Sequence, residues 1–129
     1  MGPLTLDAGA LIAADRGDRR FWAFWKQALA SRKYVPAGAL AQAWRGPRSA
    51  RIALLLAACE VIDLDEAGAR AAGELCGRAG TADVVDASVV LTAAAVGGMI
   101  LTSDPGDLER LRGHTTGHHL QVVDIGALR

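Results

Sequence analysis

Leu4-Thr-Leu-Asp7-Ala-Gly-Ala, at residues 4–10, is the stretch that decides the fold, because a short apolar run gives way there to an aspartate and then to small residues. This pattern predicts a buried strand that leads directly into a helix. Two later stretches also place aspartates where a helix is expected to start: Ala82-Asp83-Val-Val-Asp86-Ala-Ser and Met99-Ile-Leu-Thr-Ser-Asp104-Pro-Gly-Asp107-Leu. If the fold brings the three stretches together, the chain carries a carboxylate cluster suited to a metal ion.

Short strands and helices alternate along the chain. Strands are expected at residues 4–6, 34–35, 61–64, 99–102 and 120–124, and a loop at residues 113–119. Helices are expected at residues 8–14, 18–31, 37–44, 48–58, 65–78, 83–96 and 104–112. Because helical segments separate the strands, we predict an α/β protein in which a parallel sheet has helices on both faces.

The composition is that of one small globular domain. The 129 residues, of which 51% are hydrophobic, suffice for one continuous core, so residues 1–129 are expected to form a single domain. The two cysteines, Cys59 and Cys76, lack metal-ligand spacing and no secretory leader is recognised, which favours reduced thiols in a cytoplasmic protein. The longest apolar run, from Val84 to Leu101, contains an aspartate and two glycines, so we expect a helix and a strand rather than a membrane span.

The parallel topology predicts where two of the aspartates lie. Asp7 and Asp104 each follow the end of an expected strand. The carboxyl ends of parallel strands share one edge of the sheet, and ligands of open α/β folds bind at that edge. The position of Asp86 does not follow from this argument, because no strand directly precedes its helix.

Clustered carboxylates need a counterion. Two of them about 4 Å apart repel by roughly 4 kcal/mol at an effective dielectric constant near 20. A divalent cation removes this repulsion, and ligands that are all oxygen favour Mg²⁺ or Mn²⁺ over zinc. Such an ion can activate a bound water for attack on a phosphodiester.

A simpler explanation exists for most of these aspartates. An aspartate that caps a helix stabilises it by about 1 kcal/mol without any other role, and Asp7, Asp83 and Asp104 each precede an expected helix. Asp107 is explained in the same way by the helix dipole. Asp86 is explained least well, because it lies within an apolar helix, where an unpaired charge facing the core is costly.

The chain resembles PIN-domain ribonucleases, and among them the VapC-type toxins of bacterial type II toxin-antitoxin pairs. The resemblance covers nearly the whole chain and is carried by Leu6-Asp7-Ala-Gly-Ala-Leu-Ile, Pro36-Ala-Gly-Ala-Leu-Ala-Gln42-Ala-Trp44-Arg45, Asp83-Val-Val-Asp86-Ala and Leu101-Thr-Ser-Asp104-Pro-Gly-Asp107-Leu. It implies a three-layer α/β/α fold with a small parallel sheet, and RNA cleavage that depends on Mg²⁺ or Mn²⁺. It also implies that Asp7, Asp86 and Asp104 are the catalytic metal ligands, with Asp83 and Asp107 peripheral.

One residue departs from the family pattern. Gln42 stands where the family usually has a glutamate in its central helix. A glutamine retains a carbonyl oxygen but removes one negative charge from the site, so lower metal affinity is expected. Asp83 lies three residues before Asp86 on the same helical face and is a candidate to supply the missing charge.

Contact with RNA would require local positive charge, because the formal net charge of the chain is zero. Basic residues gather in two groups, each of which could hold phosphate or simply be a solvated surface: Arg16, Arg19, Arg20, Lys26, Arg32 and Lys33; and Arg45, Arg48 and Arg51.

The aromatic residues from Phe21 to Trp25 favour core packing, with a partner surface as the alternative. The family resemblance implies a cognate antitoxin and a homodimer.

Two other functions compete with a ribonuclease toxin. The first is a phosphatase or phosphotransferase with an aspartate nucleophile, which is disfavoured because no second acid lies two residues after Asp7. The second is a catalytically weak PIN domain that acts as an RNA- or protein-binding module, which the glutamine at position 42 favours. Metal-dependent turnover distinguishes the second alternative from an active nuclease.

Overall fold

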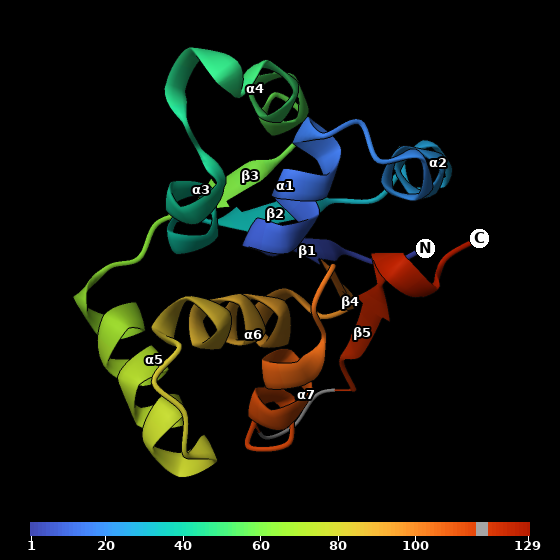
Figure 1. The fold of residues 1–129 in the computed structure, drawn as a ribbon. Coiled ribbons are helices and arrows are strands. Elements are labelled where there is room, and N and C mark those ends of the chain that lie inside the picture. Colours follow the sequence, from blue (N-terminus) through green and yellow to red (C-terminus); the bar gives the residue numbers. More distant parts are fainter. Residues whose placement is uncertain (116–118) are drawn as a thin grey trace.

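Five short parallel strands form the centre of the molecule (Figure 1), in a computed structural model that describes residues 1–115 and 119–129. The strand order is β3-β2-β1-β4-β5, so the strand that precedes Asp7 is the central one. Every neighbouring pair is parallel. The strands are β1 (Leu4–Leu6), β2 (Lys33–Pro36), β3 (Glu60–Ile62), β4 (Met99–Thr102) and β5 (Gln121–Asp124).

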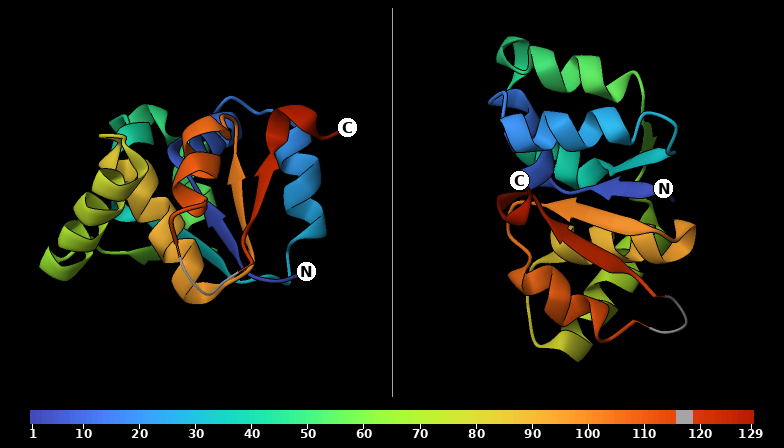
Figure 2. Two further views of the ribbon diagram at one scale, coloured as in Figure 1. Left: turned by 90° about the horizontal axis from the view of Figure 1, so that it is seen from below. Right: turned by 90° about the vertical axis from the view of Figure 1, so that its right-hand side faces the viewer.

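Helices cover both faces of this sheet, which confirms the predicted three-layer α/β/α architecture (Figure 2). One layer contains α1, α2 and α4, the other contains α5, α6 and α7, and α3 lies at the end of the sheet. The helices are α1 (Ala8–Asp15), α2 (Arg19–Gln27), α3 (Ala37–Ala43), α4 (Ala50–Leu56), α5 (Glu66–Ala79), α6 (Val84–Val96) and α7 (Gly106–Arg112). Two short 3₁₀ helices are η1 (Gly46–Arg48) and η2 (Ile125–Ala127).

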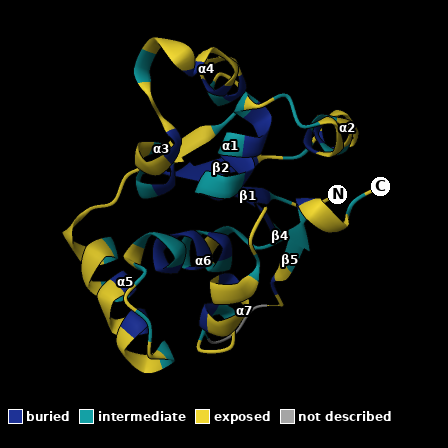
Figure 3. Ribbon diagram, viewed as in Figure 1, coloured by how far each residue is buried: buried dark blue, intermediate teal, exposed yellow. Residues whose placement is uncertain are grey.

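Two hydrophobic clusters hold the layers to the sheet (Figure 3). Leu6 and Leu101 pack with α1, α2 and α4 on one face, and Ile100 packs with α5, α6 and α7 on the other. Each fully buried aliphatic side chain contributes about 1.5–3 kcal/mol relative to exposure. Both faces of the central strands β1 and β4 are therefore covered by helices, and the positions open to polar chemistry lie at the edges of the sheet and at the strand ends.

The aromatic residues of α2 are mainly core residues. Phe21 is fully buried and Trp25 is 8% exposed, and their rings are 5.8 Å apart. The side chain of Trp22 is half-buried, and its indole N–H donates to the carbonyl of Ala14 at 3.0 Å. The core interpretation is thus confirmed for Phe21 and Trp25.

Several predicted boundaries were wrong. The helix expected to reach Ser31 ends at Gln27, and the helix expected at residues 48–58 is divided into η1 and α4. Asp104 was expected to cap the last helix, but α7 begins at Gly106 after Pro105 and has no side-chain cap. The loop expected at residues 113–119 falls in part on residues 116–118, which lie outside the described residues.

A two-glycine turn sets the direction of α6. Gly97 and Gly98 have φ values of 81° and 87°, a region that side chains disfavour. A Cβ at Gly98 would overlap the backbone of Pro3, so the turn brings β4 directly against β1. Because so short a turn joins them, α6 runs antiparallel to β4 and begins at the carboxyl edge of the sheet.

No single helix in the described ranges is long and apolar enough to cross a bilayer. Helices α5 and α6 reach the necessary length and apolarity only when taken together, and they are bent by 107° at the break between them.

Candidate metal centre

Three segments bring their aspartates to the carboxyl edge of the central strands. Asp7 follows β1 and Asp104 follows β4, as the topology predicts. The first turn of α6 adds Asp83 and Asp86 to the same edge, and α7 adds Asp107. Asp7 and Asp86 are near enough that the charge of Asp7 raises the pKa of Asp86.

Asp7 is held in one orientation by its neighbours. Its side chain is 5% exposed, and Oδ1 accepts a hydrogen bond of 2.8 Å from the backbone N–H of Ala10. Oδ2 accepts a hydrogen bond of 2.5 Å from the hydroxyl of Thr102. Asp7 is thus an N-cap, as the simpler explanation requires, but capping alone does not account for a buried carboxylate beside other acids.

Three further carboxylates converge next to it. One oxygen from each of Asp83, Asp86 and Asp107 lies within 4.8 Å of the others. Asp83 caps α6 through a bond of 3.0 Å from the backbone N–H of Asp86 to its Oδ1. Asp83 and Asp86 are half-buried and Asp107 is exposed, so the group opens to solvent on the α7 side.

Burial, together with the neighbouring charges, raises two pKa values in this group. Burial, followed by the charges of Asp83, Asp7 and Asp107, raises the pKa of Asp86 from 3.8 to about 7. Burial raises the pKa of Asp7 to about 6, and the charge of Asp104 adds to this effect. The hydrogen bond from Thr102 opposes both and lowers the pKa of Asp7.

The donor set fits a hard divalent cation. Every side chain in the cluster offers carboxylate oxygen, and neither nitrogen nor sulfur is among the grouped ligand atoms. No arginine or lysine pairs with these acids in the described part of the chain, where the ion pairs all lie elsewhere. A cation would therefore replace protons as the partner of this negative charge.

Two of the predicted site residues, Asp104 and Gln42, lie outside the group of converging carboxylates. Asp104 affects the pKa of Asp7 but is exposed and outside the group of three converging carboxylates. Gln42 is exposed on α3, and within the described residues it makes no hydrogen bond to the acids. Gly38, one helical turn before Gln42, lies against Val85 of α6, so this face of α3 is turned toward the start of that helix.

The sequence analysis missed two neighbours of Asp7. Thr102 is fully buried and links the segments that carry Asp7 and Asp104, because its oxygen also accepts from the backbone N–H of Asp104 at 2.9 Å. Ser103 places its hydroxyl where a Cβ at Gly9 would lie. The signal for both was their position at the end of β4 and just before Asp104, where a polar side chain borders the edge of the sheet.

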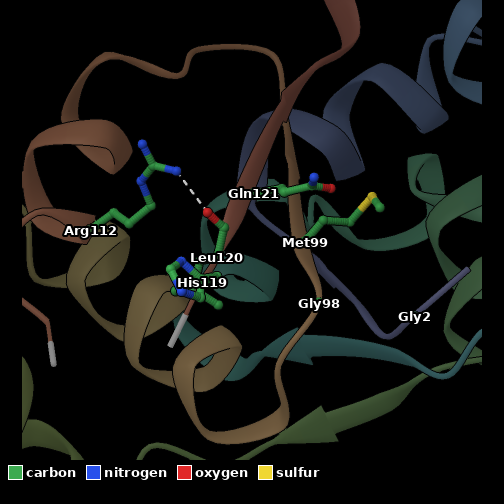
Figure 4. Close-up of a pocket in the computed structure, with 7 residues that line it drawn as sticks. All are labelled: Gly2, Gly98, Met99, Arg112, His119, Leu120 and Gln121. Atoms are coloured by element: carbon green, nitrogen blue, oxygen red, sulfur yellow. Dashed lines mark hydrogen bonds between the residues drawn. The ribbon is translucent and has the colours of Figure 1, made fainter. Parts of the chain in front are cut away.

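A separate cavity of about 680 Å³ lies at the other end of the sheet (Figure 4). Its lining includes Gly98, Met99 and Gln121, which begin or precede strands rather than end them. Arg112 borders it and donates a hydrogen bond of 2.7 Å to the carbonyl of Leu120. None of the aspartates discussed above lines this cavity.

The family can now be assigned, because residues 4–113 match the model of the PIN domain. This chain belongs to the PIN domain family. The matched part includes every aspartate of the candidate metal centre. No curated protein matches the sequence.

Solved structures share this PIN fold over nearly their full length. A VapBC2 structure from Rickettsia felis, bound to a DNA fragment from its promoter, has a TM-score of 0.69 at 13% identity and covers 95% of this chain and 98% of the other. A DNA-bound VapBC structure from Salmonella typhimurium has a TM-score of 0.68 at 16% identity, with 97% and 99% covered. The FitAcB structure from Neisseria gonorrhoeae has a TM-score of 0.67 at 16% identity, with 97% and 99% covered. At these identities the likeness concerns the fold.

Proposed function

We propose that this PIN-domain protein is a Mg²⁺- or Mn²⁺-dependent endoribonuclease and the toxin of a type II toxin-antitoxin pair. The observation that carries the proposal is the set of carboxylates at the carboxyl edge of the sheet, with two pKa values raised toward neutrality. Such a set is unfavourable in the absence of a cation and has the chemistry of a magnesium site.

In this proposal, Asp7 and Asp86 are the principal metal ligands. Asp107 and Asp83 contribute to the same site, since their oxygens converge on that of Asp86. Asp104 belongs to the acidic pocket and acts mainly through Asp7. Thr102 is a positioning residue, because its hydroxyl holds the carboxylate of Asp7 and leaves that group little rotational freedom.

A divalent ion bound there would supply an activated water and neutralise charge on a phosphodiester. The protein residues fix the geometry of that site before substrate arrives. The N-terminus of α1 and the Thr102 hydroxyl hold Asp7, and the first turn of α6 holds Asp83 and Asp86 three residues apart. Pre-organised groups of this kind reduce the cost of reaching the transition state.

We also propose a cognate antitoxin, a homodimer and a cytoplasmic location. The proposal of an antitoxin is supported by the VapBC and FitAcB structures that share this fold, although their identity with this chain is only 13% to 16%. Size-exclusion chromatography with light scattering on the purified protein tests the homodimer. Co-purification with the product of an adjacent gene tests the antitoxin.

The ribonuclease is tested by incubating purified protein with a mixture of structured RNAs in Mg²⁺, in Mn²⁺ and in EDTA. An Asp7→Asn/Asp86→Asn variant is compared with wild type, and circular dichroism establishes that both are folded. We expect cleavage that requires the metal and disappears in the variant. Cleavage that continues in EDTA or in the variant would exclude this site as its source.

The second candidate is a catalytically weak PIN domain that binds RNA or protein. The observation that favours it is Gln42, a neutral and exposed residue where the family usually has an acid. The same experiment distinguishes the two candidates. Folded protein that binds Mg²⁺, and has been freed of any partner, but fails to cleave under every condition would favour the binding module.

A further inference from the structure

A second feature adjoins the acidic centre on the side of α1 that faces α2. A cavity of about 240 Å³ starts at Gly9 and Ser103 and extends to Arg16 and Arg20. Gly9 is next to the metal centre, since a Cβ built there would lie 3.4 Å from Oδ1 of Asp7. The cavity thus connects the edge of the acidic centre with a basic region.

The basic region continues beyond this cavity. A neighbouring cavity of about 540 Å³ is lined by Arg19, Arg20, Ala23 and Arg129, so Arg20 borders both cavities. Residues of α2 or of the turn before it line both cavities, and η2, which packs against α2, contributes Ile125 and Gly126 to the smaller one. We define Arg16, Arg19 and Arg20 together as the α2 arginine cluster.

Two members of this cluster have their charge available. In the described part of the chain, the side chains of Arg16 and Arg19 make no hydrogen bond or ion pair, and both are exposed. Arg20 is partly engaged, since its guanidinium lies 3.5 Å from Asp18 and donates to the carbonyl of Gly126 at 3.1 Å. Arg20 therefore borders both cavities in a fixed position, while Arg16 and Arg19 remain available to contact a ligand.

Asp18, which also lines the smaller cavity, offsets the charge of Arg20, whereas Arg16 and Arg19 form no ion pair among the described residues. Asp18 caps α2 by accepting from the backbone N–H groups of Arg20 and Phe21, and these bonds, the one from Phe21 foremost, lower its pKa. Asp124 is similarly engaged by the backbone N–H of Gly126. Asp18 therefore stays ionised and pairs with Arg20, so the positive charge that remains available to a ligand comes from Arg16 and Arg19.

We propose that the α2 arginine cluster binds the phosphate backbone of the RNA next to the scissile phosphate. This inference rests on the proposed function and names the path of its substrate. Arg16 directly follows α1 and lies seven residues after Gly9, a rise of about 10 Å along the helix. That spacing places the arginines beyond the phosphate at the acidic centre, so they hold a neighbouring phosphate of the same strand.

Phosphate contacts would also explain how a protein with no net charge binds a polyanion beside its own acidic cluster. The other cationic residues of the first basic group are less suited to this role. Lys33, for example, is 5% exposed, its ammonium donates to the carbonyls of Leu29 and Ser31, and it lies 4.8 Å from the centre of the Trp25 ring.

The test measures RNA binding in EDTA, so that it does not depend on cleavage. A fluorescent single-stranded RNA is titrated with wild type, with Arg16→Gln/Arg19→Gln, and with Arg70→Gln/Arg78→Gln as control. The control changes the same charge on α5, in the opposite layer, at two exposed positions. We expect the slope of log K against log salt to become shallower by about 1.4 in the α2 variant, because each phosphate that an arginine neutralises accounts for about 0.7 of the slope. The control should keep the wild-type slope.

Two outcomes would overturn the inference. One is an equal change of slope in both variants, which would indicate a general effect of charge. The other is that a poly-glutamate peptide binds the protein and loses as much affinity in the α2 variant as RNA does. That result would indicate a surface for an acidic protein segment. Arginine-dependent RNA binding in a protein that never cleaves RNA would support the inference while contradicting the proposed function.

Discussion

The hydroxyl of Thr102 donates a hydrogen bond of 2.5 Å to Oδ2 of Asp7, across two adjacent strands of the sheet. The same oxygen accepts the backbone N–H of Asp104 at 2.9 Å. One buried threonine therefore ties the aspartate after β1 to the segment that follows β4. Because the bond lowers the pKa of Asp7, it favours the ionised form that binds a cation.

Replacing Thr102 with valine keeps the shape and removes the hydroxyl. We expect the free energy of unfolding to fall by about 1–3 kcal/mol, since Asp7 and the backbone N–H of Asp104 are both deprived of a buried partner. Mg²⁺ affinity should fall as well, because the pKa of Asp7 rises further. Urea denaturation and calorimetric Mg²⁺ titration measure the two effects. Thr102→Ser, which retains the hydroxyl, is the control, and equal losses in both variants would contradict this explanation.

The metal-free protein should lose stability as pH rises from about 4 to 7. In the unfolded chain Asp7 and Asp86 titrate near 3.8, whereas folding raises their pKa values to about 6 and about 7. Over this range the native state binds more protons than the unfolded state, so the free energy of unfolding decreases with increasing pH. For Asp7 the decrease is on the order of 3 kcal/mol.

Urea denaturation in EDTA at pH 4 and at pH 7.5 measures most of this decrease. Asp7→Asn is the comparison, because asparagine still caps a helix but does not titrate. The wild type should lose more stability than the variant between the two pH values, and added Mg²⁺ should restore it at pH 7.5. A variant with the same pH profile as wild type would show that Asp7 has no raised pKa.

Asp107 should contribute more to metal binding than Asp104. An oxygen of Asp107 lies within 4.8 Å of those of Asp83 and Asp86, whereas Asp104 acts on the site through the charge it presents to Asp7. We expect Asp107→Asn to weaken Mg²⁺ binding by at least as much as a charge-assisted contact is worth, about 1.5–3 kcal/mol. Asp104→Asn should have a smaller effect. The reverse order in a calorimetric titration would restore Asp104 as the direct ligand.

The sequence predicts most of the fold because its local signals agree. Apolar runs and caps predict the strands and helices, and alternation of the two predicts a parallel sheet. The location of Asp86 could also be inferred from the residues, although the topology argument did not use it. Gly97 and Gly98 form a tight turn between α6 and β4, so the 13 residues of α6 must start at the carboxyl edge, where Asp7 lies.

The relative roles of Asp104 and Asp107 could not be predicted in this way. They depend on where the last helix begins, and the Asp-Pro pair indicates a start one residue earlier than the structure has. With α7 starting at Gly106, Asp107 turns toward the first turn of α6. The contribution of Thr102 depends on the pairing of β1 with β4, which no local pattern specifies.

Gly9 and Ser103 should be energetically coupled. A Cβ at position 9 would overlap the Ser103 hydroxyl, so Gly9→Ala forces that side chain to move. In the Ser103→Ala background the overlap with the hydroxyl is absent, and alanine should then gain up to about 1 kcal/mol of helix propensity over glycine. A double-mutant cycle by urea denaturation measures the coupling, which we expect to be on the order of 0.5 kcal/mol or more. Additive effects would mean that Ser103 rotates away at no cost.

Gln42→Glu should tighten Mg²⁺ binding. The substitution adds a carboxylate to the face of α3 that packs toward the start of α6, where the other acids converge. An additional nearby negative charge raises the affinity for a divalent cation and also increases repulsion in its absence. We therefore expect higher Mg²⁺ affinity together with lower stability in EDTA, measured by titration calorimetry and thermal denaturation. Gln27→Glu, at an exposed position on α2, adds the same charge away from the acids and should leave both quantities unchanged. Equal Mg²⁺ affinities for the two variants would indicate that the side chain at position 42 does not reach the site.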